Sequence, residues 1–525
     1  MRRAACLALL ALVLLITPRS AHAQEDVERL HQAADALDAL RLEDAEALLA
    51  PLFAAENVSP EVTFEHGLLR YYQGDYVRAR AELVASAVRA TGTRDASSRF
   101  ELARIADATL DATRAFVITR SADGRFEVRH SSQDAHMAGY ALDVMARVDS
   151  ALFEELAYRH PGPVRLDILP TTQHLARVSS LTVEEIETTG TIALCKWDRL
   201  IITSPRALVR GYPWADTLGH EYVHLILARM TNDLAPVWVQ EGYARYLETR
   251  WRGIREGDPL DARSSQLLYE AVRANELLPF ERLHPSIARL PSAEMAALAF
   301  AQVCTFVGLF REEHGAQGLR NVAARLAAGE DAREAFAHVG GLPWDALEAR
   351  WVDAVRARPA PTETAEDMAL RFRHGTAEVD ETAEVSAQEA RDALRLGDML
   401  FGRQRYAAAA FEYERARVVS PEDPIVNTRL ARAAYTAGDA ARALEVLLPI
   451  RARHPQHAPL LALISAAAAR VGRNDLAREA ALESVWLNPF DPEPHCALES
   501  ALEAGAALAS DGSLREVASV ACAGR

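Results

Sequence analysis

The sequence predicts a central α+β domain with an all-α helical repeat unit on each side. Three prolines and three alanines in the C-terminal third recur with a period of about 34 residues, which is typical of stacked helix pairs. Runs with strand-like alternation open the middle of the chain, and helical patterns follow them. With 525 residues, 50% of them hydrophobic, the chain exceeds what one core accommodates, so we expect two or more compact domains.

The charge balance excludes one class of partner. The formal net charge is -16 at pH 7, and no cluster of lysine or arginine stands outside the first few residues. Binding to nucleic acid needs a basic face that neutralises phosphates. We therefore expect a solvated acidic surface and no nucleic-acid partner.

Residues 1–23 have the three parts of a secretory signal peptide. Arg2 and Arg3 precede an apolar run over 4–16, and a small-residue cleavage site follows at 21–23. The run is shorter than a membrane span needs, although an uncleaved anchor is the alternative. No later stretch is expected to be apolar enough to cross a bilayer. The mature chain should start at Gln24, be exported, and be periplasmic or secreted.

A helical repeat unit is predicted over 24–115. Gly67, Gly74, Tyr76 and Ala79 have the offsets of a helix–turn–helix repeat, and a further alanine lies one repeat period before Ala79. Small residues let two helices approach closely, and glycine accommodates the turn between them. The first repeat is degenerate, as suits a capping position.

The central domain is predicted over 116–358. Short β-rich runs open it, at 125–130, 164–170 and 190–204. A helical stretch over 134–158 separates the first two runs, and a tight turn near 196–198 divides the third. Helical patterns then continue to the end of the domain, so strands come first and helices later, as in an α+β domain.

A linker over 359–390 and a repeat domain over 391–525 complete the chain. The linker is acidic, rich in Pro, Thr, Glu and Ala, and poor in large apolar side chains. In the repeat domain the recurring residues are Pro421, Pro455, Pro489, Ala409, Ala443 and Ala477, with Gly438 and Gly472 at turns and Tyr406 and Tyr413 between helices. This pattern resembles the tetratricopeptide repeat, which implies a concave helical groove for a peptide or protein partner.

One segment carries two histidines at metal-ligand spacing. Residues 216–229 read DTLGHEYVHLILAR, an amphipathic helix with its cap expected at Asp216 or Thr217. His220 and His224 lie one turn apart on the same face, so both imidazoles can bind one ion. Asp216, one turn earlier, is expected to act as a cap rather than to orient the site.

A carboxylate follows the first histidine, and another stands on the next helix. Glu221 lies where a general base over a metal-activated water is needed. Residues 236–248 read PVWVQEGYARYLE, and the chain between His224 and Glu241 is long enough to finish one helix, turn and return. Glu241 then completes a His2Glu site with one position open for water. Gly242 and Ala244 are expected where the two helices approach each other.

Together, HEYVH and WVQEGYARYLE resemble the gluzincin metallopeptidases, and more narrowly the peptidase-MA-like domains, over roughly 120–355. The resemblance implies a thermolysin-like α+β fold and an edge strand that aligns the substrate, either the strand that leads into 201–203 or its partner near 191–193. It also implies the functional residues, with Zn2+ held by His220, His224 and Glu241, and Glu221 as the general base.

One position departs from that pattern. Such domains commonly have Tyr where this chain has Phe300, which lacks a hydroxyl that could hydrogen-bond the oxyanion. Other side chains that could take this role are Tyr222, Tyr243, Tyr246 and His174. The alternative for the tyrosines is packing, and for the histidine it is simple solvation.

Four cysteines remain after export, namely Cys195, Cys304, Cys496 and Cys522. An exported protein can form disulfides, and Cys496 with Cys522 is the pair worth testing. The alternative is that these residues are small buried apolar side chains. No CxxC spacing supports a cysteine-based zinc site.

Three functions remain in view. The first is an exported zinc-dependent metallopeptidase whose helical repeats bind its substrate or a protein partner. The second is a tetratricopeptide scaffold of the cell envelope with a vestigial peptidase fold. The third is a zinc hydrolase that acts on a non-peptide bond. The intact HExxH motif and Glu241 favour the first, because drift would be expected to remove a ligand.

Overall fold

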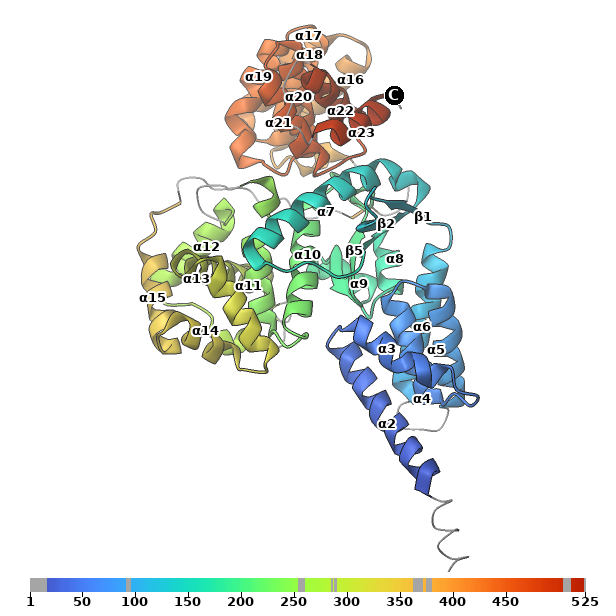
Figure 1. Cartoon of the computed structure of the whole chain (residues 1–525). Coiled ribbons are helices and arrows are strands. Elements are labelled where there is room, and N and C mark those ends of the chain that lie inside the picture. Colours follow the sequence, from blue (N-terminus) through green and yellow to red (C-terminus); the bar gives the residue numbers. More distant parts are fainter. Residues whose placement is uncertain are drawn as a thin grey trace, which may run out of the picture.

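Three parts follow one another along the chain: N-terminal helices, a sheet covered by helices, and a C-terminal helical array (Figure 1). The computed structural model describes residues 17–90, 96–253, 260–284, 287, 290–361, 372–373, 380–503 and 511–523. The apolar run predicted as the core of a signal peptide lies outside the described residues.

The central part is built on a five-stranded mixed sheet with the strand order β1-β2-β3-β5-β4. The strands are β1 (Val117–Arg120), β2 (Phe126–His130), β3 (Val164–Leu169), β4 (Ala193–Lys196) and β5 (Arg199–Thr203). β2, β3 and β5 run parallel, and the two outer strands pair antiparallel with their neighbours. Of the two strands proposed as the edge, β4 lies at the edge. The other candidate for the edge, the strand through 201–203, is β5. This prediction is wrong, because β5 pairs with β3 on one side and with β4 on the other.

The hairpin between β4 and β5 turns where it was predicted. Trp197 and Asp198 both have φ of 56°, the left-handed conformation that tight hairpin turns need. Asp198 is held there by Arg229, whose Nε and Nη2 donate to its carboxylate at 2.8 and 2.6 Å. His160 Nε2 lies 3.1 Å from the same carboxylate. This buried cluster joins the hairpin to the end of the helix that carries His220.

Helices cover the sheet and extend beyond it. α7 (Ala135–Leu156) connects β2 to β3, as the helical stretch over 134–158 predicted. The remaining helices of this part are α8 (Thr172–Arg177), α9 (Val183–Thr189), α10 (Trp214–Met230), α11 (Val237–Leu247), α12 (Ala262–Ala274), α13 (Ala293–Ala327), α14 (Ala332–Gly340) and α15 (Trp344–Arg356).

α13 corrects one expectation from the sequence. It is long and apolar enough to meet a length and composition test for a membrane span, with a window of mean hydropathy 1.6, although no later stretch was expected to do so. In the fold, 56% of that window is buried, and Val303 and Val307 lie against α11. α13 is therefore a central core helix of this domain.

The N-terminal helices attach to the sheet through a buried arginine. They are α2 (Thr17–Asp38), α3 (Leu42–Phe53), α4 (Pro60–Tyr72), α5 (Tyr76–Arg89) and α6 (Ala96–Thr113). Arg199 of β5 is 1% exposed and donates to the hydroxyls of Tyr71, at 2.9 Å, and Tyr76. The Tyr76 hydroxyl in turn donates to Asp167 of β3 at 3.0 Å. Tyr76, predicted as a repeat residue, thus joins this unit to the sheet.

The C-terminal array consists of paired helices. They are α16 (Gln388–Gly402), α17 (Tyr406–Val419), α18 (Pro424–Thr436), α19 (Ala440–Leu447), α20 (Ala458–Arg470), α21 (Asn474–Val485), α22 (Pro492–Glu503) and α23 (Asp511–Ala523). The three alanines that recur with the repeat period are fully buried between helices. A Cys496–Cys522 disulfide joins α22 to α23, while Cys195 and Cys304 are not in disulfides.

Part of the predicted linker lies against the central domain. Phe372 forms an isolated antiparallel bridge with Leu208. The Arg373 guanidinium donates to the carbonyl oxygens of Leu208 and Val209, both at 2.9 Å. The linker therefore contacts the segment that leads into α10.

Candidate metal centre

The helix that carries the histidines begins earlier than predicted. α10 starts at Trp214, with Pro213 at its N-cap position, so a cap at Asp216 or Thr217 is wrong. The Asp216 carboxylate instead accepts two hydrogen bonds from Arg252, each at 2.6 Å. This ion pair ties the first turn of α10 to the segment that follows α11.

Three side chains converge between α10 and α11. His220 Nε2 lies 3.1 Å from His224 Nε2 and 3.3 Å from Glu241 Oε2. Glu241 Oε1 lies 3.8 Å from His224 Nε2. Among the described residues, this is the one group of three histidine, cysteine or carboxylate side chains that is close enough to share an ion.

These separations fit a tetrahedral zinc ion. Zinc binds imidazole nitrogen and carboxylate oxygen at about 2.0–2.2 Å, so two of its ligands stand about 3.3 Å apart. Two of the three separations agree with that spacing, and the third exceeds it by about half an ångström. The donor set, two imidazoles and one carboxylate, is also the set of catalytic zinc sites that keep a position open.

A second carboxylate, not singled out from the sequence, orients the first histidine. Glu248 Oε2 lies 2.9 Å from His220 Nδ1, so this nitrogen donates to the carboxylate and Nε2 is the ring nitrogen available to an ion. Glu248 ends α11 seven residues after Glu241, two turns along the same face. That spacing is the signal by which it could have been found.

The pKa values of His220, His224 and Glu241 indicate that a positive charge is favoured between these side chains. Burial acts to lower the pKa of His220, but Glu241 and Glu248 outweigh it and raise that pKa to about 10. Burial lowers the pKa of His224 to about 4. Burial acts to raise the pKa of Glu241, yet the histidines outweigh it and lower that pKa to about 2. A cation stabilises an arrangement of this kind.

The predicted base lies between the helix and the edge strand. Glu221 is 8% exposed, and burial raises the pKa of its carboxyl to about 7, although the nearby His220 opposes the rise. A pKa near neutrality suits a group that must both accept and return a proton. The Cys195 backbone acts to lower the pKa of Glu221, so β4 lies beside this carboxylate.

The glycine that permits the close approach at this site is not the predicted one. A Cβ on Gly242 would lie 2.7 Å from Val307 Cγ2, so Gly242 faces α13, and its expected role between α10 and α11 is wrong. A Cβ on Gly219 would lie 2.4 Å from the carbonyl oxygen of Glu248. Gly219 therefore lets α10 approach the end of α11 next to His220.

The tyrosine hydroxyls considered for the oxyanion have other partners. Tyr222 donates to Asp149 at 2.9 Å, Tyr243 donates to the carbonyl oxygen of Leu319 at 2.9 Å, and Tyr246 bonds with Arg250. His174 Nδ1 lies 2.8 Å from the Thr171 hydroxyl. The arrangement therefore favours packing roles for the tyrosines.

A positively charged side chain, that of Arg245, lies beside Phe300. The Arg245 guanidinium lies over the Phe300 ring, 4.8 Å from its centroid, and 3.6 Å from Glu248. Its charge acts to lower the pKa of both Glu221 and Glu241. Arg245 follows Glu241 by one helical turn, a spacing that places both on one face.

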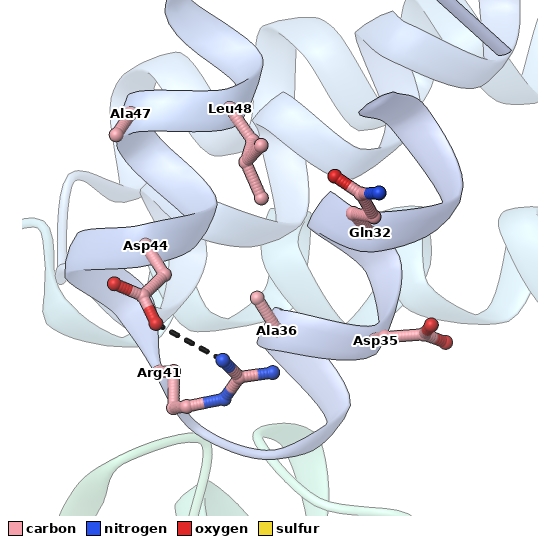
Figure 2. Close-up of a pocket in the computed structure, with 7 residues that line it drawn as sticks. All are labelled: Gln32, Asp35, Ala36, Arg41, Asp44, Ala47 and Leu48. Atoms are coloured by element: carbon pink, nitrogen blue, oxygen red, sulfur yellow. Dashed lines mark hydrogen bonds and ion pairs between the residues drawn. The ribbon is translucent and has the colours of Figure 1, made fainter. Parts of the chain in front are cut away.

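A separate hollow of about 470 Å³ lies in the N-terminal unit, between α2 and α3 (Figure 2). An Arg41–Asp44 pair at 3.1 Å lies on its wall. It is lined by Gln32, Asp35, Ala36, Arg41, Asp44, Ala47 and Leu48. None of these residues belongs to the metal centre.

Comparison with known proteins identifies two kinds of domain in the chain. Residues 150–357 match the family model of the Peptidase MA superfamily, and residues 400–467 match a model of the tetratricopeptide repeat. No curated protein matches the chain. The chain thus contains a Peptidase MA superfamily domain and tetratricopeptide repeats. β1 and β2 precede the first match although they belong to the same sheet.

Two solved structures are similar to parts or all of the chain. The first tetratricopeptide domain of Spaghetti, bound to an HSP90 peptide, is 20% identical, with a TM-score of 0.23, covering 23% of this chain and 98% of that chain. A chain of the crystal structure of the APC/C hetero-tetramer Cut9–Hcn1 is 14% identical, with a TM-score of 0.23, covering 94% of this chain and 94% of that chain. At these scores neither supports an argument about this chain.

Proposed function

We propose that the chain is an exported, zinc-dependent metallopeptidase of the gluzincin type. The observation that carries the proposal is the convergence of His220, His224 and Glu241 beside the buried carboxylate of Glu221. The Peptidase MA superfamily match over 150–357 supports the reaction class. Export, to a periplasm or to the medium, rests on the N-terminal pattern of the sequence.

In this proposal, different residues of the chain bind the metal, transfer the proton and align the substrate. When bound to His220, His224 and Glu241, zinc supplies a Lewis acid that polarises a peptide carbonyl and acidifies water. Glu221 takes the proton of the attacking water and passes it to the leaving amine. The exposed edge of β4, beside Glu221, aligns an extended substrate by backbone hydrogen bonds.

The helical repeats recruit the substrate or a protein partner in this proposal. The tetratricopeptide match over 400–467 supports a protein-binding role, because such repeats present extended surfaces to peptides. The acidic net charge of -16 is consistent with a protein partner and not with nucleic acid.

The test is turnover of a peptide library by the purified mature chain loaded with zinc, beside Glu221→Gln. Mass spectrometry of the products identifies the bond that is cleaved. The wild type should cleave peptide bonds, and Glu221→Gln should bind zinc equally well and lose at least about a hundredfold in rate. Cleavage by Glu221→Gln at the wild-type rate would overturn the assignment of the base. Cleavage of a non-peptide bond alone would support the alternative hydrolase.

A scaffold with a vestigial peptidase fold is the second candidate. It is favoured by Phe300, which offers no hydroxyl, and by the three tyrosine hydroxyls that are bonded elsewhere. A chain that binds no zinc and cleaves no peptide, yet captures a protein through residues 391–525, would establish it.

A further inference from the structure

We propose that Trp486 of the C-terminal repeats is a positioning residue of the metal centre, so that zinc affinity depends on how these repeats dock. The inference rests on the proposed zinc site. It goes beyond that site in assigning part of its support to a residue of a different domain, far along the chain from the ligands.

Trp486 lies directly after α21 and contacts the segment that follows α11. Its ring meets that of Trp251 edge-on, with centroids 4.8 Å apart. The guanidinium of Arg252 lies over the Trp486 ring, 4.4 Å from its centroid. Trp251 is 7% exposed, so this contact is desolvated and the aromatic pair stabilises the docking beyond the burial of its area.

Trp251 and Arg252 each contact a residue of α10 that lies close to His220, the first metal ligand. Arg252 donates two hydrogen bonds, each at 2.6 Å, to Asp216, which lies one turn before His220 on α10. Trp251 Cδ1 lies 3.5 Å from the Cβ position of Gly219, the residue before His220. The same short segment also follows Glu248, whose carboxylate fixes the His220 ring. Displacement of this segment therefore changes the orientation of His220.

The repeats also hold the start of α10. The Trp214 indole N–H donates to the carbonyl oxygen of Val485 at 2.9 Å, and the Tyr212 backbone N–H donates to that of Leu487 at 3.0 Å. A Cβ on Gly211 would lie 2.1 Å from the Leu487 oxygen, so only glycine permits this approach. Residues 485–487 thus contact both α10, at its first turn, and the segment after α11.

The experiment measures the zinc dissociation constant of the full chain by competition with a chromogenic chelator. Trp486→Ala should bind zinc about tenfold or more weakly than the wild type, the range found when groups that orient metal ligands are lost. Trp486→Phe keeps an aromatic face for Trp251 and Arg252 and should restore the affinity to within about threefold.

Tyr435→Ala is the matched control. Tyr435 is a half-buried aromatic side chain of the same repeats, and it also carries an arginine, Arg470, 4.0 Å from its ring centroid. Its removal costs the repeats a similar contact without touching the segment after α11. Zinc affinity should stay at the wild-type value in this variant, which separates positioning from a general loss of stability.

Arg252→Met tests the same path of contacts, from Trp486 through Arg252 to Asp216, if Trp486→Ala folds poorly. It cuts the link between Trp486 and Asp216 and should weaken zinc binding to a similar extent. The effects of the two substitutions should fall short of additive, because they break one path. Wild-type affinity in both variants would overturn the inference and leave the proposed function intact. A wild type that binds no zinc would overturn both.

Discussion

Glu248 shows how one residue outside the ligand set shapes the candidate centre. Its carboxylate lies 2.9 Å from His220 Nδ1 and thereby holds the ring so that Nε2 faces His224 and Glu241. The partner of a ligating histidine fixes both its tautomer and its basicity. Glu248 also lies 3.6 Å from Arg245, which neutralises part of its charge.

Replacing Glu248 should weaken metal binding without removing a ligand. We expect Glu248→Ala to raise the zinc dissociation constant about 10–100-fold, and Glu248→Gln to raise it less, because an amide oxygen still accepts a hydrogen bond from His220. Isothermal titration with a competing chelator measures both values. Asp353→Ala, which removes an exposed carboxylate on α15, is the control and should have no effect. Equal affinities in all of these proteins would refute the role of Glu248.

The sequence predicts those residues of the candidate site that belong to a motif, and it does not predict those outside one. The spacing of His220, Glu221 and His224 and the distance to Glu241 suffice to predict a cluster, and the structure brings His220, His224 and Glu241 together near Glu221. Their role as zinc ligands and base stays a prediction. Gly219 and Arg252 escape prediction, because their importance depends on contacts with groups far away in the sequence.

Among the elements, α10 is fixed at both ends by arginine–aspartate pairs. Arg252 pairs with Asp216 at its start, and Arg229 pairs with Asp198 at its end. The second pair is almost fully buried, with side-chain exposures of 4% and 1%. Removing one partner of a buried pair leaves an uncompensated charge, which costs more than the pair itself contributes.

Asp198→Asn should therefore destabilise the central domain by about 3 kcal/mol or more. Asparagine tolerates the left-handed conformation at this position, so the loss reports the charge pair and not backbone strain. Urea unfolding of the full chain, followed by circular dichroism, measures the change. Glu445→Gln removes an exposed partner of Arg442 and should change stability by less than about 1 kcal/mol. A similar small change in Asp198→Asn would contradict this role of the buried pair.

The start of α20 carries a histidine that should make the repeats sensitive to acid. Burial, together with the charges of Arg210 and His454, lowers the pKa of His457 from 6.5 to about 3. Its Nδ1 accepts a hydrogen bond from the Leu460 N–H, so the neutral form caps the helix. The unfolded chain takes up a proton below pH 6.5, and the folded chain does not until about pH 3.

Stability of the repeats should consequently fall as the pH falls through this window. We expect a loss of about 1.5 kcal/mol from this group between pH 6.5 and pH 5. His457→Asn keeps an acceptor at the N-cap and removes the titration, so it should flatten the dependence on pH. Urea midpoints measured across this range compare the two proteins, and parallel curves would contradict the prediction.

Helices and strands with a periodic hydrophobic pattern could be predicted from the sequence. Short strands, and helix ends that depend on tertiary contacts, could not. The helices from α10 to α15, the β4–β5 turn and the repeat helices follow from hydrophobic period and turn residues. β1 was missed because its four residues are mostly exposed and show no alternation of burial. The cap of α10 was misplaced because Asp216 is engaged by Arg252, a tertiary contact.

In the whole molecule, the N-terminal helices and the C-terminal repeats both dock onto the central domain through specific polar contacts. The N-terminal helices attach through Arg199, Tyr71 and Tyr76, and the C-terminal array attaches through residues 485–487. The partners in these contacts lie far apart in the chain, so the periodic pattern of the repeats could not reveal them. The C-terminal repeats therefore help to hold the Peptidase MA superfamily domain in place.

Binding of zinc by His220, His224 and Glu241 is the claim on which the proposed function rests. Elemental analysis of the purified mature chain, supplied with zinc and then dialysed, measures the metal bound per chain. We predict about one zinc in the wild type and none in the double variant His220→Ala, His224→Ala. A wild-type chain that binds no zinc would contradict the claim, and would favour a repeat scaffold built on a peptidase fold that no longer works as an enzyme.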